Sequence, residues 1–362
     1  MDFKTTINIL KLFLSTAFFL SLTTASSSKI FTSSTSNITA IFGFGDSTID
    51  TGNNNYIPTD TRSNYPPYGR DFPFRIPTGR FSNGKLPIDL ITASLGLKRL
   101  LPPYLKPLLT SFELPTGASF GSAGSGLDPL TSQAANVLSM PDQISLFDQA
   151  LSRIRRLKGQ ERAEFIVKNA LFFFSIGTND FTNYYNTRQR ADEFNISGYQ
   201  DFILKRYEDA IRSLYNRGAR RFAVTGLWPV GCLPIQITIN NITNPRRCVE
   251  AQNIDSIAYN VKLRELATAL EIQLQGSRIA FYEQYASILD MINNPATHGF
   301  EETLRGCCGT GLFEFGTTCT PTTPTCPDAS KFLFWDAVHP TLAAYIFLAN
   351  MALDTVIPDV AA

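Results

Sequence analysis

Short apolar runs that favour β-strands alternate along this chain with longer segments in which apolar residues recur at helical spacing. The strand-like runs are residues 39–44, 118–120, 171–176, 221–225 and 278–282. Helical spacing is found at residues 86–95, 202–215 and 254–274, and Pro340 stands where it could open a last helix through Leu353. This alternation predicts an α/β fold, in which helices cover both faces of a parallel sheet.

The same pattern indicates one folded domain. A prior of about 150 residues per domain would divide 362 residues in two, but no linker-like change of composition separates two cores. We therefore expect residues 26–362 to form a single domain. The Pro-rich, aromatic stretch 56–81 and the Thr/Pro-rich stretch 317–327 are expected to be ordered loops, the second held by cysteines.

The N-terminus has the pattern of a secretory signal. Lys4 and Lys11 precede the apolar run 12–22, and small residues follow at the spacing of a cleavage site. The alternative is a retained membrane anchor, but the apolar run is well short of the ~20 residues that span a bilayer. We therefore predict that residues 1–25 are a cleaved signal peptide, that no membrane span remains, and that the protein is extracellular.

Secretion makes disulfides the expected state of the six cysteines, because oxidising compartments let such bonds persist. Six cysteines permit 15 pairings, which sequence alone does not resolve. Adjacent Cys307 and Cys308 would form a strained ring with each other, so each is expected to bond elsewhere, with Cys319 and Cys326 nearest in sequence. Cys232 and Cys248 would then form the third pair. The alternative is that one or two cysteines stay free and buried.

A secreted chain also passes the glycosylation machinery. The pattern Asn-X-Ser/Thr occurs at Asn37, Asn195 and Asn241. These three asparagines are the candidate glycosylation sites.

Charge and histidine content exclude two classes of function. The 32 basic and 31 acidic residues leave a net charge of +1, which argues against nucleic acid as a partner. His298 and His339 are the only histidines, so a His-rich metal site is excluded. His298 lies in a turn-like stretch and is interpreted as a surface side chain.

Polar residues that suit nucleophilic catalysis follow two of the strand-like runs and precede the last helix. The first run leads into Gly45-Asp-Ser-Thr, which places Ser47 at the edge where open α/β sheets bind ligands. The third run ends in Gly177-Thr-Asn-Asp. In Asp336-Ala-Val-His339 the carboxylate is close enough to hold one ring nitrogen while the other faces a nucleophile. Taken singly, each block has a plainer interpretation: a polar turn for the first two and a helix cap for the third.

Taken together, the three blocks resemble those of the plant-type GDSL esterases and lipases of the SGNH hydrolase superfamily. The resemblance covers nearly the whole chain after residue 25. Its supporting segments are Gly45-Asp-Ser-Thr-Ile-Asp-Thr-Gly-Asn-Asn-Asn55, Tyr65-Pro-Pro-Tyr-Gly-Arg-Asp-Phe72, Gly79-Arg-Phe-Ser-Asn-Gly-Lys85 and Cys307-Cys-Gly-Thr-Gly311. It implies a flavodoxin-like, three-layer α/β/α fold with a five-stranded parallel sheet in the order 2-1-3-4-5.

The resemblance also implies roles for single residues. Ser47 is the expected nucleophile, and Asp336 and His339 complete a catalytic triad. The developing oxyanion would be stabilised by the N–H groups of Ser47 and Gly124 and by the side-chain amide of Asn179.

The chain departs from the family pattern at three places. Thr48 replaces the usual Leu, Ser119 replaces an Asn, and Ala123 replaces the first of two glycines. Ala123 matters only if it prevents the turn that directs the Gly124 N–H.

The resulting hypothesis is a secreted hydrolase of carboxylic esters whose substrates are small-molecule or polymer acyl esters, of lipid or cell wall, without metal or cofactor. Asp46 and Asp180 are interpreted as groups that hold loops by hydrogen bonds rather than as a metal pair. An acyltransferase that builds polyesters such as cutin, and an inactive binding protein, are the alternatives. Loops 56–81 and 100–115 are expected to select the substrate.

Overall fold

The computed structural model describes residues 37–240, 245–315 and 318–362. The predicted signal peptide, residues 1–25, and the candidate glycosylation site Asn241 lie outside the described residues. The two other candidate asparagines, Asn37 and Asn195, are exposed.

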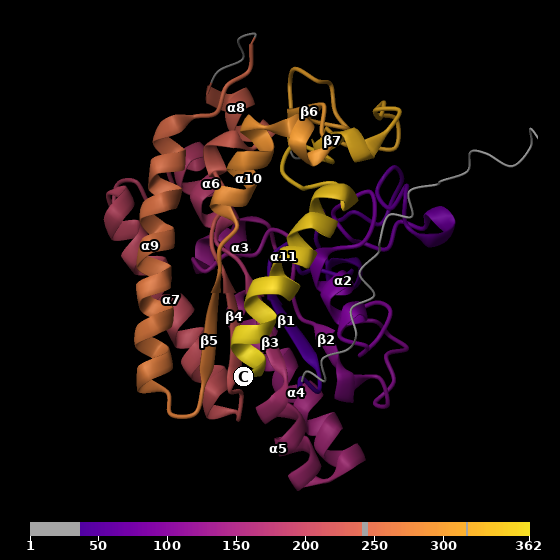
Figure 1. Ribbon diagram of the computed structural model, residues 1–362, viewed down its shortest axis with the longest axis vertical. Helices are drawn as coiled ribbons and strands as arrows, with labels where there is room; N and C mark the ends of the chain where they lie inside the picture. Colours follow the sequence, from indigo (N-terminus) through magenta and orange to yellow (C-terminus); the bar gives the residue numbers. More distant parts are fainter. Residues whose placement is uncertain (1–36, 241–244, 316–317) are drawn as a thin grey trace, which may run out of the picture. The chain divides into compact units, whose positions relative to one another are not determined.

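A parallel sheet lies at the centre of the fold (Figure 1). Its five strands are hydrogen-bonded in the order β2-β1-β3-β4-β5, and every neighbouring pair is parallel. They are β1 (Ile41–Gly45), β2 (Gly117–Ser119), β3 (Leu171–Ser175), β4 (Arg221–Thr225) and β5 (Arg278–Tyr282). The predicted α/β class and the strand order 2-1-3-4-5 are confirmed. The predicted strand bounds are correct for β4 and β5 and shift by one to two residues in the others.

Helices cover both faces of this sheet. One layer contains α4, α7 and α9, and the opposite layer contains α2 and α11 (Figure 1). The α-helices are α2 (Pro87–Ser94), α3 (Pro129–Ala134), α4 (Met140–Lys158), α5 (Gln160–Asn169), α6 (Thr178–Thr187), α7 (Ile196–Asn216), α8 (Pro234–Asn240), α9 (Glu250–Gln273), α10 (Tyr285–Asn293) and α11 (Leu342–Ala361). Short 3₁₀ turns are η1 (Asn53–Tyr56), η2 (Pro73–Arg75), η3 (Leu114–Thr116), η4 (Val230–Cys232), η5 (Pro295–His298) and η6 (Ala329–Lys331).

Successive side chains of β1 point to opposite faces of the sheet, and this explains how the two helix layers pack against the strand. Phe42 and Phe44 point to the α4 side, where the Phe147 ring meets both at centroid distances of 5.1 and 6.0 Å. Gly43 points to the α2 side, where a Cβ would lie 2.6 Å from Cδ1 of Ile88. The glycine therefore lets α2 pack directly on the strand that carries the site.

The last helix begins and ends later than its predicted bounds. Thr341 caps α11, because its hydroxyl accepts a hydrogen bond from the Ala344 N–H, so Pro340 precedes the helix rather than opening it. Among the described residues, α11 is the one helix whose length and composition would suit a membrane span. Tyr345 and Leu348 are nevertheless fully buried, and α11 contacts α2, β4 and β5 as a core helix does.

A small second sheet and two of the three disulfides hold the segment that precedes α11. Strands β6 (Glu302–Gly306) and β7 (Phe332–Phe334) pair in parallel. The N–H of Cys307 donates to the Phe334 carbonyl at 3.0 Å. The disulfides are Cys232–Cys248, Cys307–Cys326 and Cys308–Cys319. The prediction that Cys307 and Cys308 bond to separate partners is confirmed, and the alternative of free cysteines is wrong.

Candidate active site

Ser47 stands at the carboxyl end of β1, in the turn that follows Gly45. The Gly45 φ angle is +142°, and a Cβ there would lie 1.9 Å from the Ser175 carbonyl oxygen, so β1 approaches β3 this closely only with glycine. The Asp46 N–H donates to the same carbonyl at 3.1 Å. This turn leaves Ser47 only 7% exposed, and its N–H has no hydrogen-bond partner among the described residues.

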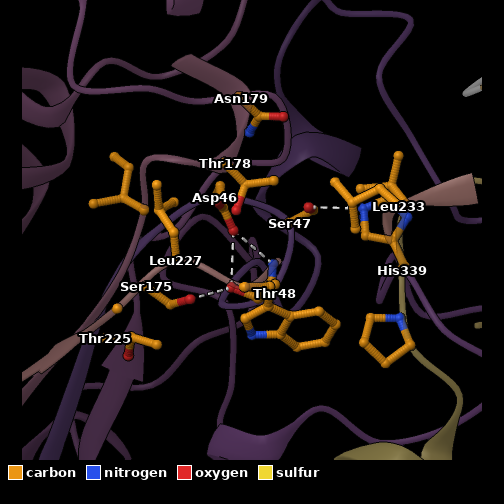
Figure 2. A pocket seen from close by; sticks show the side chains of 15 residues that line it. Asp46, Ser47, Thr48, Ser175, Thr178, Asn179, Thr225, Leu227, Leu233 and His339 are labelled. Atoms are coloured by element: carbon orange, nitrogen blue, oxygen red, sulfur yellow. Dashed lines mark hydrogen bonds between the residues drawn. The ribbon is translucent and has the colours of Figure 1, made fainter. Parts of the chain in front are cut away.

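The fold brings Ser47, His339 and Asp336 into one hydrogen-bonded row. His339 Nε2 lies 2.8 Å from Ser47 Oγ, although the two residues are 292 positions apart (Figure 2). On the other side of the ring, Nδ1 lies 2.9 Å from Asp336 Oδ1 and 2.8 Å from Oδ2. The three predicted triad residues therefore have the geometry that proton transfer from serine to histidine requires.

Asp336 is buried, and the backbone N–H groups that donate to it lie within its own loop rather than at a helix end. Oδ1 accepts from the N–H groups of Val338 at 2.8 Å and His339 at 2.7 Å. Because Thr341 caps α11, the alternative interpretation of Asp336 as a helix cap is wrong. Burial alone would raise the pKa of Asp336, but the His339 ring and these N–H groups outweigh it and hold the pKa below its ordinary value.

A fourth residue, Tyr68, touches this row and was missed from the sequence. Its hydroxyl donates to Asp336 Oδ2 at 2.7 Å. The only sequence signal for it is its place in the Tyr65-Pro-Pro-Tyr-Gly-Arg-Asp-Phe72 segment.

Asn179 lies in the first turn of α6, so the polar-turn interpretation of Gly177-Thr-Asn-Asp is wrong. Gly177 is the N-cap residue, with φ of +125°. The Asn179 side chain lines the same pocket as Ser47 (Figure 2), and its Nδ2 donates to the Ser125 carbonyl at 2.9 Å. One of the two amide hydrogens therefore remains for another acceptor.

Gly124 is the residue before Ser125, whose carbonyl accepts the hydrogen bond from Asn179. Its φ of +85° shows that the glycine-specific turn forms despite the neighbouring Ala123. The Gly124 N–H has no hydrogen-bond partner in the described part of the chain, whereas the Ala123 N–H donates to Asp50 Oδ2 at 3.1 Å. Gly124 does not itself line the pocket beside Ser47.

The two carboxylates that flank these blocks hold backbone turns. Asp46 Oδ1 accepts from the N–H and the hydroxyl of Thr48 at 3.0 and 2.8 Å (Figure 2). Asp180 accepts from the N–H groups of Leu127 and Asp128 at 2.8 and 3.0 Å. Burial raises the pKa of Asp46 to about 6 and that of Asp180 to about 7. Among the described residues, no cluster of three His, Cys, Asp or Glu side chains could hold a metal ion.

The pocket beside Ser47 is small and mostly apolar. Leu227, Trp228 and Leu233 form its apolar wall, and the polar side includes Ser175 and Thr225 (Figure 2). It encloses about 30 Å³, which is room for about two water-sized groups.

The expected substrate loops do not line this pocket. Its walls come from the turns after β1, β3 and β4 and from residues 338–340, because the carboxyl ends of neighbouring strands converge there. Residues 56–81 and 100–115 instead line a separate cleft of about 700 Å³. The residues that line the pocket are therefore set by which strands are neighbours in the sheet, and not by the aromatic and proline content of the two loops.

The sheet order, with serine, histidine and aspartate in a row at its carboxyl edge, is typical of hydrolases that use serine. A family model described as GDSL-like lipase/acylhydrolase matches residues 41–351. The chain belongs to this family of carboxylic ester hydrolases, the GDSL esterases and lipases.

Plant relatives resemble the chain over most of its length. GDSL esterase/lipase At2g40250 of Arabidopsis thaliana is 46% identical over 326 residues, which are 89% of this chain and 90% of the relative. GDSL esterase/lipase At1g06990 of the same plant is 46% identical over 312 residues, 86% of this chain and 87% of the relative. Among solved structures, a catalytic mutant of Axe2, an acetylxylan esterase from Geobacillus stearothermophilus, is 13% identical with a TM-score of 0.37, covering 87% and 93%.

Proposed function

We propose that this protein is a secreted serine hydrolase that cleaves carboxylic esters through an acyl-enzyme on Ser47. The observation that carries the proposal is the continuous row of hydrogen bonds from Ser47 Oγ through the His339 ring to Asp336. Small-molecule or polymer acyl esters of lipids or cell walls are the proposed substrates.

Acylation begins when Ser47 Oγ attacks the ester carbonyl carbon. A serine hydroxyl is a weak nucleophile, so its proton passes to His339 Nε2 as the bond forms. The buried Asp336 carboxylate stabilises the imidazolium and holds the tautomer that has the proton on Nδ1. The imidazolium then protonates the alcohol oxygen, and the alcohol leaves.

As Ser47 attacks, negative charge develops on the former carbonyl oxygen of the ester, and hydrogen-bond donors are needed to stabilise it. The N–H groups of Ser47 and Gly124 have no partner among the described residues, and Asn179 keeps one amide hydrogen after its bond to Ser125. We assign these three groups to the oxyanion, because donors fixed before the reaction need no reorganisation in the transition state.

Deacylation repeats these steps with water as the nucleophile. His339 Nε2 takes a proton from water as it attacks the acyl carbon, then returns it to Ser47 Oγ as the acid leaves. The apolar wall of the pocket suits the part of the substrate next to the ester bond.

Covalent features of the chain support the proposed extracellular location. Three disulfides are compatible with an oxidising compartment. We propose residues 1–25 as the signal peptide and 26–362 as one domain, with glycans at Asn37, Asn195 and Asn241. The family match over residues 41–351 supports the domain proposal.

The test uses secreted protein and p-nitrophenyl esters of graded chain length. Wild type should release nitrophenol and bind an organophosphorus ester covalently at Ser47, and Ser47→Ala should do neither. Wild type that neither hydrolyses any ester nor takes the label would point to the inactive binding protein. An alcohol acceptor that diverts most of the acyl group into new ester would favour the acyltransferase.

A further inference from the structure

The segment Tyr65–Phe72 reaches the Asp336 carboxylate from a distant part of the chain. Tyr68 is 3% exposed, and its hydroxyl donates to Asp336 Oδ2 at 2.7 Å across 268 positions of sequence. The row of hydrogen bonds at the site therefore extends by one residue, from Ser47 through His339 and Asp336 to Tyr68.

The two carboxylate oxygens are held in different ways. Oδ1 accepts from two N–H groups of its own loop, Val338 and His339. Oδ2 accepts from the His339 ring at 2.8 Å and from Tyr68. Among the described residues, Tyr68 is thus the one donor to Oδ2 other than the ring that Asp336 must orient.

Tyr68 is itself held in place by aromatic neighbours. Its ring meets those of Tyr65, Phe81 and Trp335 edge-on, at centroid distances of 5.5, 5.6 and 6.4 Å. The Phe81 ring also lies 4.8 Å from the His339 ring. Burial and the Asp336 charge raise the pKa of Tyr68 well above its ordinary value, so its hydroxyl keeps the proton that it donates.

We propose that Tyr68 is a positioning residue of the esterase, which fixes the Asp336 carboxylate so that the His339 ring faces Ser47. This inference rests on the proposed function. It gives Tyr68 a role in setting the catalytic geometry rather than in substrate choice.

The main variant is Tyr68→Phe, which keeps the ring and removes the hydroxyl. Without this hydroxyl the carboxylate is free to turn away from the His339 ring, and misplacement that costs about as much as one hydrogen bond to a charged group implies a fall in kcat of roughly 10- to 100-fold. KM should be unchanged because Tyr68 does not line the pocket. The matched control is Tyr65→Phe, since the Tyr65 hydroxyl donates to the Cys319 carbonyl instead. It should retain wild-type kcat.

A double-mutant cycle shows whether Tyr68 acts through Asp336. The readout is the rate at which an organophosphorus ester labels Ser47. Tyr68→Phe should slow labelling in the wild type and should have no further effect in an Asp336→Ala background. An equal loss in both backgrounds, or an unchanged kcat in Tyr68→Phe, overturns the inference. If Asp336→Ala leaves labelling intact, the proposed triad itself is wrong.

The pH profile gives a second readout that altered packing would not move. The titratable groups that face Asp336 are His339, Tyr65, Tyr68, Tyr345 and Glu314. Tyr68→Phe removes one hydrogen-bond donor from the Asp336 carboxylate, which then stabilises the His339 imidazolium more strongly. The acid limb of the pH profile, where the rate of Ser47 labelling rises with pH, should therefore move to higher pH.

A fluorinated tyrosine covers the case in which the phenylalanine variant fails to fold. Incorporation of 3-fluorotyrosine at position 68 keeps the packing and strengthens the donor, so the acid limb should move to lower pH. A limb that does not move with 3-fluorotyrosine also overturns the inference.

Discussion

Loss of the Arg80 guanidinium should destabilise the whole fold, because it would leave a carboxylate buried without its cation. Arg80 Nε and Nη2 form a two-point ion pair with Asp89 Oδ2 and Oδ1 at 2.7 and 2.8 Å. The side chains are 5% and 0% exposed. Arg80 also donates to the carbonyl groups of Thr51 and Leu101, both at 3.0 Å.

The magnitude follows from burial. Removing one partner of a buried pair costs about 3–5 kcal/mol. Within the described part of the chain, Asp89 then keeps only the N–H groups of Leu86 and Leu101 as donors, at 3.1 and 3.0 Å, and these do not replace a cation. We therefore expect Arg80→Met to lower the free energy of unfolding by about 3–5 kcal/mol, a large part of the ~5–15 kcal/mol of a typical domain.

Urea unfolding followed by circular dichroism measures this loss, with a midpoint shift at unchanged slope. The matched control is Lys205→Met, because Lys205 pairs with Asp209 at 2.7 Å on the surface, where both side chains are about 60% exposed. The control should unfold at the wild-type midpoint. A loss below about 1 kcal/mol in Arg80→Met would refute the reasoning.

Three further predictions concern the site. Asn179→Ala should lower kcat by about 10² to 10³ with little change in KM, measured with p-nitrophenyl esters; wild-type kcat would remove Asn179 from the oxyanion. Labelling of Ser47 should rise with pH as the imidazole loses its proton, and His339→Ala should abolish that rise, whereas His298→Ala should not; the reverse result would contradict the triad. Burial raises the pKa of Asp180 to about 7, so its contribution to stability is complete below about pH 4 and is lost as the pH rises through about 7. Asp180→Asn should flatten the dependence of Tm on pH in that window, and an unchanged slope would contradict the assignment.

Local patterns in the sequence were sufficient to predict the strands and to single out candidate site residues, whereas the strand order and the roles of those residues came from the resemblance to the GDSL family. The strands 221–225 and 278–282 have the predicted bounds, because a buried parallel strand is a short, nearly continuous apolar run. Ser47 and His339 were proposed as candidates because each belongs to a short block of polar residues next to a strand or helix. Apolar runs and polar blocks are patterns among residues that are neighbours in sequence, so they can be recognised without the fold.

Features that depend on distant partners were decided by the tertiary structure alone. Gly177-Thr-Asn-Asp has the composition of a turn, yet it begins α6, where Asp180 accepts from Leu127 and Asp128. The sequence left open which of Cys319 and Cys326 pairs with Cys307. Tyr68 meets Asp336 across 268 positions. Local patterns do not encode such contacts, because the packing that fixes them exists only after the sheet and its helices have assembled.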